Sequence, residues 1–463
     1  MRALVNNPIW LPIIVNFLFL FIVFLMLIFL AKPTLGKISS AIIDRVLSDE
    51  YSQNLSEIIT SEKRISVLKT IELNLRAQNG QIIARPMGSP KNFPGYDMLM
   101  FSPPIMTKLS LTESTNVDMQ VTLGPKAVKP LTIKIPLMIT GMAYGLSLSE
   151  EAKRALARAA KTMQTATNSG EGPFLPEERQ EAGKYILQIS RWPWGGRTAE
   201  QIAVADMLEV QMGQGADMGA SVARPIYGKA QKLAGLAPGQ PAISLPAPPG
   251  VQKPEDWPLF MSKLRQKANG IPISLKLMAT GRLEEELAVA IELGFDAIVL
   301  DGAQGGTYGT APVKQDDFGI PTLNALVRAE RFLKERGVRD QISLISAGGY
   351  FTPGECLKAL ALGADAIYLG SLPLMALAHG QTSKVVPWEA PATLVFYDAP
   401  VTNTKLNIDQ AAFSVINLFT SMVSEMEEAM RGLGKTSLKE LSPDDLVALD
   451  SYTAEVTGVK RIY

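Results

Sequence analysis

The sequence predicts an α/β fold built as a (β/α)8 barrel, with an N-terminal transmembrane helix and additional helical segments at both ends. Three observations favour this fold: eight short apolar runs, helix-forming stretches between them, and one long uncharged apolar segment near the amino end. Apolar strands followed by helices are typical of a parallel sheet covered on its outer face, and eight such units fit a closed barrel. An open doubly wound sheet, with some runs misassigned, is the alternative.

The expected strands are short runs that end in glycine or polar residues. They cover residues 137–141, 163–167, 186–190, 208–212, 272–278, 297–301, 342–346 and 366–370. Stretches such as SLSEEAKRALARAAK lie between them, and Gly363 stands where a glycine often ends a helix. The alternation therefore predicts one helix after each strand.

Composition divides the chain into five parts. They are an amino-terminal tail (1–9), a transmembrane helix (10–31), a leader that packs on the barrel (32–130), the barrel (131–404) and a C-terminal helical segment (405–463). Apolar residues at helical spacing between Ile408 and Met430 predict a core-facing helix in the last part. We expect this helix to close one end of the barrel.

The segment 10–31 holds 22 residues without a charge, enough to cross a hydrocarbon core of about 30 Å. A cleaved signal peptide is the alternative, although its apolar region usually spans only about 7–15 residues. Lys32, Lys37 and Arg45 follow the segment and only Arg2 precedes it. The positive-inside rule therefore predicts a single-pass membrane protein whose catalytic body is cytoplasmic.

Charge balance and two scarce residue types exclude several functions. Basic and acidic residues both number 45, so no overall positive field attracts nucleic acid, and we expect no such partner. Cys356 is the only cysteine and His379 the only histidine. The chain therefore cannot form an internal disulfide, a cysteine-ligated iron–sulfur or zinc site of its own, or a histidine pair. We expect no metal.

Glycines follow the last two expected strands. Gly348 and Gly349 follow the seventh strand, and Gly370 and Ser371 follow the eighth. In a barrel these two loops commonly bind phosphate, and glycine lets backbone N–H groups approach it closely. The alternatives are ordinary turns or a site for a ligand that carries phosphate.

A lysine interrupts the fifth run, ISLKLMA. A buried Lys276 needs a partner, and near a flavin its ammonium would stabilise the anionic reduced ring; a misassigned edge strand is the alternative. The sixth strand ends with Asp301 and continues through Gly302, Gly305 and Gly306. This loop suits a cover over a bound ring or phosphate, although an ordinary connection would look the same.

The second strand is followed by TNSGEGPF, which contains Asn168 and Glu171. Glu171 could bind a substrate amine or carry a proton, and it could equally cap the next helix. We take Lys276, Glu171 and Asp301 as the candidate catalytic residues.

Several motifs, in this order, resemble the FMN-binding synthase domain of glutamate synthases over roughly residues 95–445. They are PLMITGMAYGLSLSEEAKRALARAA, TNSGEGP, EVQMGQGA, ISLPAPP, SLKLMA, DGAQGGTYGTAP, SAGGYFTPGECLKALALGADAIYLGS and LGKTSLKEL. The chain looks most like the stand-alone, membrane-anchored members. Each motif is weak alone, and the shared order carries the resemblance.

The resemblance implies a barrel with FMN at its mouth. It assigns the phosphate to Gly348, Gly349, Gly370 and Ser371, and places Lys276 at the N1 edge of the ring. Further cofactor contacts are implied for Met142, Ala143, Asn168, Gln188, Gln214, Gly302, Gly305 and Gly306. In the family, an imine formed from 2-oxoglutarate and ammonia accepts a hydride from flavin N5 and becomes glutamate.

Three departures bear on the activity. The cysteines that hold an iron–sulfur cluster in large family members are missing after the eighth strand, so we expect no cluster. The family motif is QGAKPGEGGQ, and the corresponding segment of this chain is QGADMGASVA. Asp217 and Ala223 therefore stand where the family has the lysine and glutamine expected to hold the oxoacid carboxylates. Arg224 could compensate for the missing lysine. No glutaminase domain is present, so ammonia would come free or from a separate amidotransferase subunit.

These features predict an FMN-dependent oxidoreductase that aminates a 2-oxoacid reductively or performs a related C–N redox reaction at the membrane. A separate electron-donor subunit would then be needed. The alternative is a flavin-binding subunit that is non-catalytic or depends on its partners.

Overall fold

The computed structural model describes residues 10–50, 54, 56–85, 88–306, 310–381 and 406–463. It contains two compact units, residues 1–83 and 84–463. The expected tail 1–9 and the end of the expected barrel segment, 382–404, lie outside the described residues.

The first unit holds three helices: α1 (Trp10–Ser48), α2 (Glu57–Ile65) and α3 (Val67–Asn79). The Asn54 side chain joins α1 to α2, because its amide donates to the Val46 carbonyl (2.7 Å) and its oxygen accepts from the Ser56 N–H (2.8 Å). Helix α1 contains the expected span 10–31, and from Val15 it is long and apolar enough to cross a membrane. A signal sequence near the amino end can meet the same criteria of length and composition.

The second unit is built on an eight-stranded parallel sheet in the order β4-β13-β12-β11-β10-β7-β6-β5. The strands are β4 (Leu137–Ile139), β5 (Ala166–Asn168), β6 (Lys184–Ile189), β7 (Met207–Gln211), β10 (Ile273–Met278), β11 (Ala297–Asp301), β12 (Ser343–Ala347) and β13 (Ala366–Leu369). Each expected run overlaps one of these strands. The second strand begins latest, at Ala166 instead of residue 163, because Met163 still caps helix α4. The predicted (β/α)8 barrel is confirmed.

The two outermost strands, β4 and β5, close the barrel without a regular ladder. The Thr165 hydroxyl donates to the Leu137 carbonyl (2.6 Å), and the Lys134 N–H donates to the Gln164 carbonyl (3.0 Å). Backbone groups at this closure are therefore satisfied locally, as buried polar groups must be.

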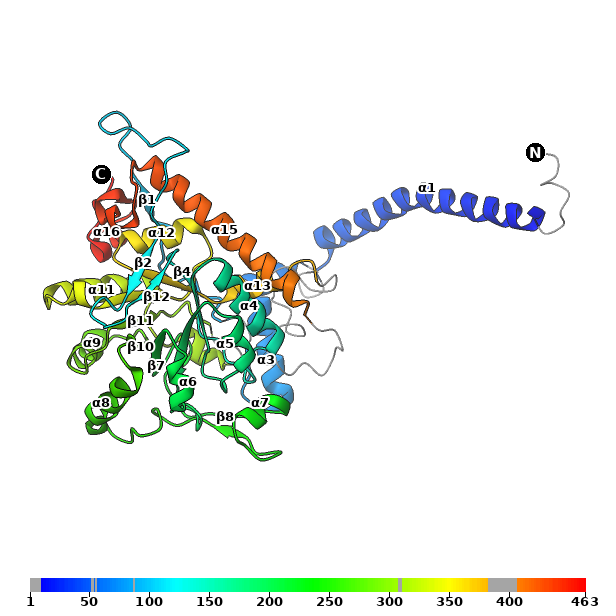
Figure 1. Ribbon diagram of the computed structural model, residues 1–463. Coiled ribbons are helices and arrows are strands. Elements are labelled where there is room, and N and C mark those ends of the chain that lie inside the picture. Colours follow the sequence, from blue (N-terminus) through cyan, green and yellow to red (C-terminus); the bar gives the residue numbers. More distant parts are fainter. Residues whose placement is uncertain (1–9, 51–53, 55, 86–87, 307–309, 382–405) are drawn as a thin grey trace. The chain divides into compact units, whose positions relative to one another are not determined.

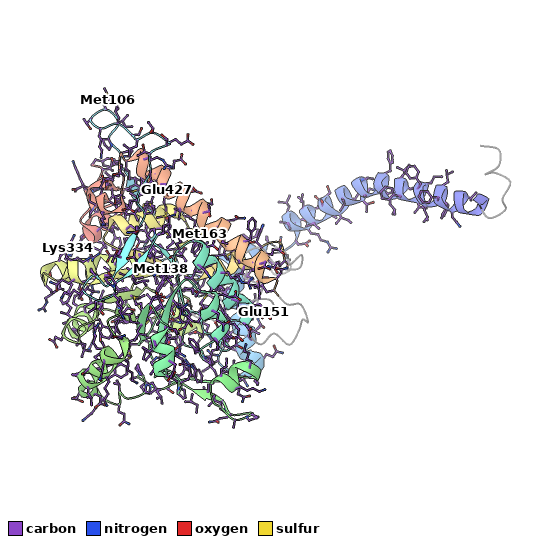
Figure 2. The ribbon with its side chains drawn as sticks, viewed as in Figure 1. Met106, Met138, Glu151, Met163, Lys334 and Glu427 are labelled. Atoms are coloured by element: carbon purple, nitrogen blue, oxygen red, sulfur yellow. The ribbon has the colours of Figure 1, made fainter. Side chains whose placement is uncertain are left out.

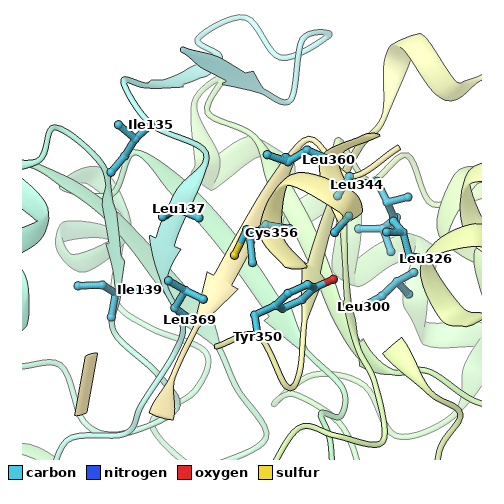
Figure 3. Close-up of a cluster of buried hydrophobic side chains, with 14 of the residues drawn as sticks. Ile135, Leu137, Ile139, Leu300, Leu326, Leu344, Tyr350, Cys356, Leu360 and Leu369 are labelled. Atoms are coloured by element: carbon cyan, nitrogen blue, oxygen red, sulfur yellow. The ribbon is translucent and has the colours of Figure 1, made fainter. Parts of the chain in front are cut away.

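Helices surround the strands (Figure 1). They are α4 (Glu150–Thr162), α5 (Pro176–Glu181), α6 (Ala199–Ala203), α7 (Gly228–Leu233), α8 (Trp257–Ala268), α9 (Leu283–Glu292), α10 (Pro312–Asp316), α11 (Thr322–Glu335), α12 (Pro353–Ala361), α13 (Ser371–Leu377), α15 (Ile408–Gly432) and α16 (Ser451–Thr457). Figure 3 shows outward side chains such as Leu344 and Leu369 beside Leu360 and Cys356 of α12. Strand side chains alternate between this outer core and the barrel interior.

Short antiparallel strands complete the unit. They are the pairs β1 (Leu99–Phe101) with β14 (Leu446–Ala448), β2 (Val121–Leu123) with β3 (Leu131–Ile133), and β8 (Ala223–Arg224) with β9 (Ala242–Ile243). The β2–β3 hairpin buries Leu123, Leu131 and Ile133 in one cluster with interior strand residues such as Val299, and Gly124 donates its N–H to the Ser343 hydroxyl (3.0 Å) at the start of β12. The hairpin therefore closes the amino end of the barrel.

Helix α15 buries the expected apolar stripe, including Val415, Phe419 and Met426. The prediction that it closes one end of the barrel was wrong. It packs against α4 and α13 in the outer layer, because the β2–β3 hairpin already fills the amino end. Figure 2 shows Met106 away from this layer, at the tip of the loop after β1.

Candidate functional site

Five polar side chains occupy inward positions on five strands, above an apolar layer. They are Asn168, Gln188, Glu209, Lys276 and Tyr368, and each is at most 2% exposed. Strand pairing fixes their level: Gln188 is opposite Glu209, and Lys276 is opposite Gln211. Their strands all run in the same direction, so the five side chains gather toward the carboxyl end, where barrel enzymes place their chemistry.

Glu209 is the centre of the first group. Its Oε1 accepts from Asn168 Nδ2 (2.9 Å) and Gln188 Nε2 (2.7 Å), and its Oε2 accepts from the Tyr368 hydroxyl (2.8 Å). Asn168 Oδ1 accepts in turn from the Gly170 N–H (2.9 Å). Glu209 thus holds two predicted cofactor residues, Asn168 and Gln188, in place. Each of them uses an amide N–H for its bond to Glu209.

Lys276 is 1% exposed and lies between three groups. Its Nζ donates to Thr140 Oγ1 (3.1 Å), lies 3.4 Å from Asp301 Oδ2, and sits 5.7 Å from the centre of the Tyr368 ring. The structure therefore brings two of the candidate catalytic residues together. The other Asp301 oxygen, Oδ1, is buried and has no hydrogen-bond partner in the described structure.

Glu171, the third candidate, follows β5 and lies near Arg191 and Asp217. Burial and the Asp217 carboxylate raise the pKa of Glu171 from 4.5 to about 7, and Arg191 partly offsets them. Its backbone carbonyl accepts from Trp194 Nε1 (2.9 Å), while its Oε2 is buried and unpartnered among the described residues. A carboxyl group with this pKa can hold or release a proton near neutral pH.

Arg191 is 2% exposed and bonded to Asp217. Its NH2 lies 2.6 Å from Asp217 Oδ2, and its Nε donates to Gln211 Oε1 (3.3 Å). The amide nitrogen of Gln211 is buried and has no partner in the described structure. Arg224, which the sequence offered as compensation, belongs instead to the β8–β9 pair.

The loops at the strand ends pack backbone against backbone. A Cβ on Gly170 would lie 2.4 Å from the Met142 carbonyl carbon and 2.7 Å from the Ala143 nitrogen. A Cβ on Gly215 would lie 2.2 Å from the Gly305 oxygen, which places the loop of Gln214 against the loop of Asp301. Glycine is therefore required here for close approach.

The buried Lys153 of α4 holds two of these loops. Its Nζ donates to the carbonyls of Met142 (2.8 Å), Asn168 (2.9 Å) and Ser169 (3.1 Å), and it pairs with Glu178 Oε1 (2.9 Å). Helix α4 therefore positions the first two strand ends, although the sequence gives Lys153 only as one residue of a helical stretch.

The predicted phosphate residues divide into two groups. Gly348 (φ +104°) and Gly349 (φ +81°) adopt left-handed backbone, and a Cβ on Gly349 would lie 2.6 Å from the Gln304 Cβ. Both positions thus need glycine for local reasons as well. Gly370 packs beside Thr140, and Ser371 begins α13. In the described part of the chain, neither bonds the Lys276–Asp301 pair. Gly306, which was predicted as a further cofactor contact, is exposed.

Comparison with known proteins identifies the family of this chain. The family model for the conserved region in glutamate synthase matches residues 96–436. The chain belongs to the glutamate synthase family. The resemblance inferred from the ordered motifs is confirmed.

Within this family, a glutamate synthase large subunit-like protein of Rhizobium meliloti is 30% identical over 412 residues, covering 84% of this chain and 92% of that protein. An archaeal-type glutamate synthase (NADPH) of Thermotoga neapolitana is 29% identical, covering 74% of this chain and 68% of that protein. A solved flavocytochrome b2 variant with sulfite bound shares the fold, with a TM-score of 0.52, 18% identity, and coverage of 80% and 82%.

Sequence reasoning did not single out several residues of the site, among them Glu209, Tyr368, Arg191 and Gln211. Glu209 and Tyr368 carry the same signal as Lys276, a polar side chain inside an apolar run at an inward position. Arg191 and Gln211 stand at strand ends, where polar residues are common and the sequence does not reveal their partners.

Proposed function

We propose that this chain is an FMN-dependent oxidoreductase of the glutamate synthase type, acting on a CH–NH2 group or the corresponding imine. The family reaction is the reductive amination of 2-oxoglutarate to glutamate, and a related C–N redox reaction is the second form of the proposal. The observation that carries it is the buried Lys276–Asp301 pair among glycine-rich strand ends of a family barrel.

The residues fit FMN. Asp301 Oδ1, on the carboxylate that pairs with Lys276, is buried and has no partner among the described residues, so a polar group of the bound cofactor would satisfy it. Lys276 provides a buried positive charge at the same end. When bound, FMN supplies hydride transfer at its N5 atom.

The chain's own residues would then take separate roles. Gly348, Gly349, Gly370 and Ser371 would hold the phosphate, and Lys276 would hold negative charge at the ring. Met142, Ala143, Asn168, Gln188, Gln214, Gly302, Gly305 and Gly306 would line the ring and ribityl chain. Glu171 would hold or release a proton at Oε2, because its pKa lies near 7.

We also propose a location and partners. Residues 10–31 would insert in lipid and leave the catalytic body in the cytoplasm as a single-pass protein. The substrates would be a 2-oxoacid and ammonia or their C–N product. Electrons or ammonia would come from a separate donor or amidotransferase subunit, and the chain would hold no iron–sulfur cluster.

The test is to purify the full chain in detergent, denature it and identify any released chromophore by mass. We expect FMN near one per chain. A folded protein that carries no flavin and takes up no added FMN would contradict the proposal. FMN without turnover of any oxoacid, amine or amino acid would favour the partner-dependent subunit instead.

The Lys276→Ala variant sharpens this test. Removing the ammonium should lower FMN retention or its reduction potential, because a positive charge near the ring favours the anionic reduced form. Lys334→Ala, at an exposed lysine of α11 labelled in Figure 2, is the matched control and should change neither property. An unchanged FMN content and reduction potential in Lys276→Ala would show that Lys276 does not contact the flavin.

A further inference from the structure

Asp217 is built into its loop as a fixed anion. Its Oδ1 accepts from the Gly219 N–H (3.1 Å), and its backbone exchanges two hydrogen bonds with Gln214 (2.9 and 2.8 Å). Its Oδ2 lies 2.6 Å from Arg191 NH2. This carboxylate is therefore held in place by its own turn and by the buried guanidinium.

The same contact occupies Arg191. Its NH2 faces Asp217, its Nε donates to Gln211, and its NH1 lies 3.5 Å from the Ala220 carbonyl. A substrate carboxylate that reached this guanidinium would have to share its charge with Asp217. Displacing Asp217 would leave a part-buried carboxylate without its cation, which is strongly unfavourable.

Lys276 is committed in a similar way, since it faces Asp301, Thr140 and the Tyr368 ring. Each of these two cations thus already has a carboxylate. Among the described residues near Asp217, the buried atoms without a hydrogen-bond partner are one carboxyl oxygen, Glu171 Oε2, and two nitrogen donors, Gln211 Nε2 and Trp192 Nε1. A ligand with an N–H donor and a carbonyl acceptor would satisfy both kinds of atom.

The family resemblance indicates how the charge of this site differs from that of the family. At the position of Asp217 the family motif has a lysine, which is expected to hold a carboxylate of the oxoacid. Replacing lysine by aspartate changes the local charge by two units toward negative. This change disfavours a dianionic substrate and favours a cation.

Resting on the proposed function, we propose that the end of the barrel around Glu171, Asp217 and Gln211 binds a substrate with a protonated amine in place of a 2-oxo dicarboxylate. The ammonium would donate to the carboxyl oxygens, and a neutral carbonyl on the substrate would accept from Gln211 Nε2. The substrate class is a monocationic amine or amino amide.

Calorimetric titration of the purified full chain at pH 7 tests this, with L-alaninamide, its uncharged counterpart L-lactamide, and 2-oxoglutarate as probes. We expect alaninamide to bind at least about tenfold more tightly than either other probe, as a charge-assisted hydrogen bond allows. Tighter binding of 2-oxoglutarate, equal binding of the two amides, or no binding of alaninamide would each overturn the inference.

Two variants locate the effect. Asp217→Lys should reverse the preference: the affinity for alaninamide should fall and the affinity for 2-oxoglutarate should rise, each by about tenfold or more. The affinities of Asp217→Asn should lie between those of the parent and those of Asp217→Lys. Glu171→Gln should weaken the binding of alaninamide without disturbing Asp217. Circular dichroism establishes that this variant is folded. Retained alaninamide preference in both folded Asp217→Lys and Glu171→Gln would also overturn the inference.

FMN content measured in the same samples separates the two proposals. A flavin-loaded protein that prefers 2-oxoglutarate contradicts the amine substrate alone. A folded protein without flavin contradicts the oxidoreductase itself.

Discussion

Two carboxyl groups at the same end of the barrel have opposite surroundings. Glu209 accepts three side-chain hydrogen bonds, so both its oxygens are satisfied. Glu171 follows β5, which β6 separates from the strand of Glu209, and its Oε2 is buried without a partner among the described residues. Burial is shared, and hydrogen bonding distinguishes the two.

This difference in hydrogen bonding distinguishes a carboxyl group that supports the structure from one that a ligand can contact. A satisfied buried network rigidifies its surroundings, and removing one member leaves several groups unpaired. An unsatisfied buried group is costly unless a ligand completes it, and it titrates near neutral pH when its charged form is disfavoured. Glu209 therefore positions Asn168 and Gln188, whereas Glu171 keeps a buried oxygen without a partner among the described residues, as the proposed substrate contact requires.

The largest expected effect comes from breaking the satisfied group. Glu209→Ala leaves the Gln188 amide and the Tyr368 hydroxyl without this acceptor, and leaves the Asn168 amide only its bond to the Tyr368 hydroxyl (3.1 Å). Because these groups remain buried, we expect a loss of roughly 3–5 kcal/mol in the free energy of unfolding. Urea denaturation of the full chain in detergent measures it.

Glu209→Gln is the matched control. It keeps the volume and one acceptor oxygen, and the Tyr368 hydroxyl can accept from the new amide, so the loss should be much smaller. Equal losses in both variants would mean that the three hydrogen bonds do not determine stability here.

The next effect depends on pH and concerns Glu171. Its pKa is about 7 in the folded chain against 4.5 ordinarily, so the folded state binds more protons than the unfolded state between these values. Stability should therefore fall as pH rises through this window. Glu171→Gln removes the titration and should be more stable than the parent at pH 8, by up to roughly 3 kcal/mol at about 1.4 kcal/mol per pKa unit.

Thermal unfolding of both proteins between pH 4 and 8 checks this expectation. The two curves should converge near pH 4, where the parent glutamate is protonated in both states. If both proteins show the same pH dependence between pH 4.5 and 7, the burial of Glu171 does not disfavour its charge.

The comparison also shows what the sequence could and could not predict. Alternation of apolar runs and helices predicted all eight strands, because burial on both faces of a parallel sheet leaves a strong pattern. Lys276 was found because a charge inside such a run is conspicuous. Glu209 carries the same signal, and two-residue periodicity would have placed it on the inward face with Lys276.

Loop partners left no such pattern. Asp217 was recognised as a departure from the family motif, but its partner, Arg191, lies 26 residues earlier in another loop. The sequence suggested Arg224 instead, because Arg224 is near in the chain. Contacts between loops depend on how strands are brought together, which local periodicity does not specify. The hairpin that closes the amino end escaped prediction for the same reason.

The smallest effect tests whether the Glu171 segment is held as firmly as the Glu209 group. Trp194→Phe removes the indole N–H that donates to the Glu171 carbonyl (2.9 Å) and keeps an aromatic ring beside Trp192, on which Trp194 stacks. We expect a loss of about 1 kcal/mol in stability, typical of one hydrogen bond, and weaker binding of alaninamide. Trp257→Phe, the same change at a half-buried tryptophan of α8, controls for packing. If Trp194→Phe leaves alaninamide affinity unchanged, as the control should, the position of Glu171 does not depend on this hydrogen bond, and the contrast with Glu209 rests on the side chains alone.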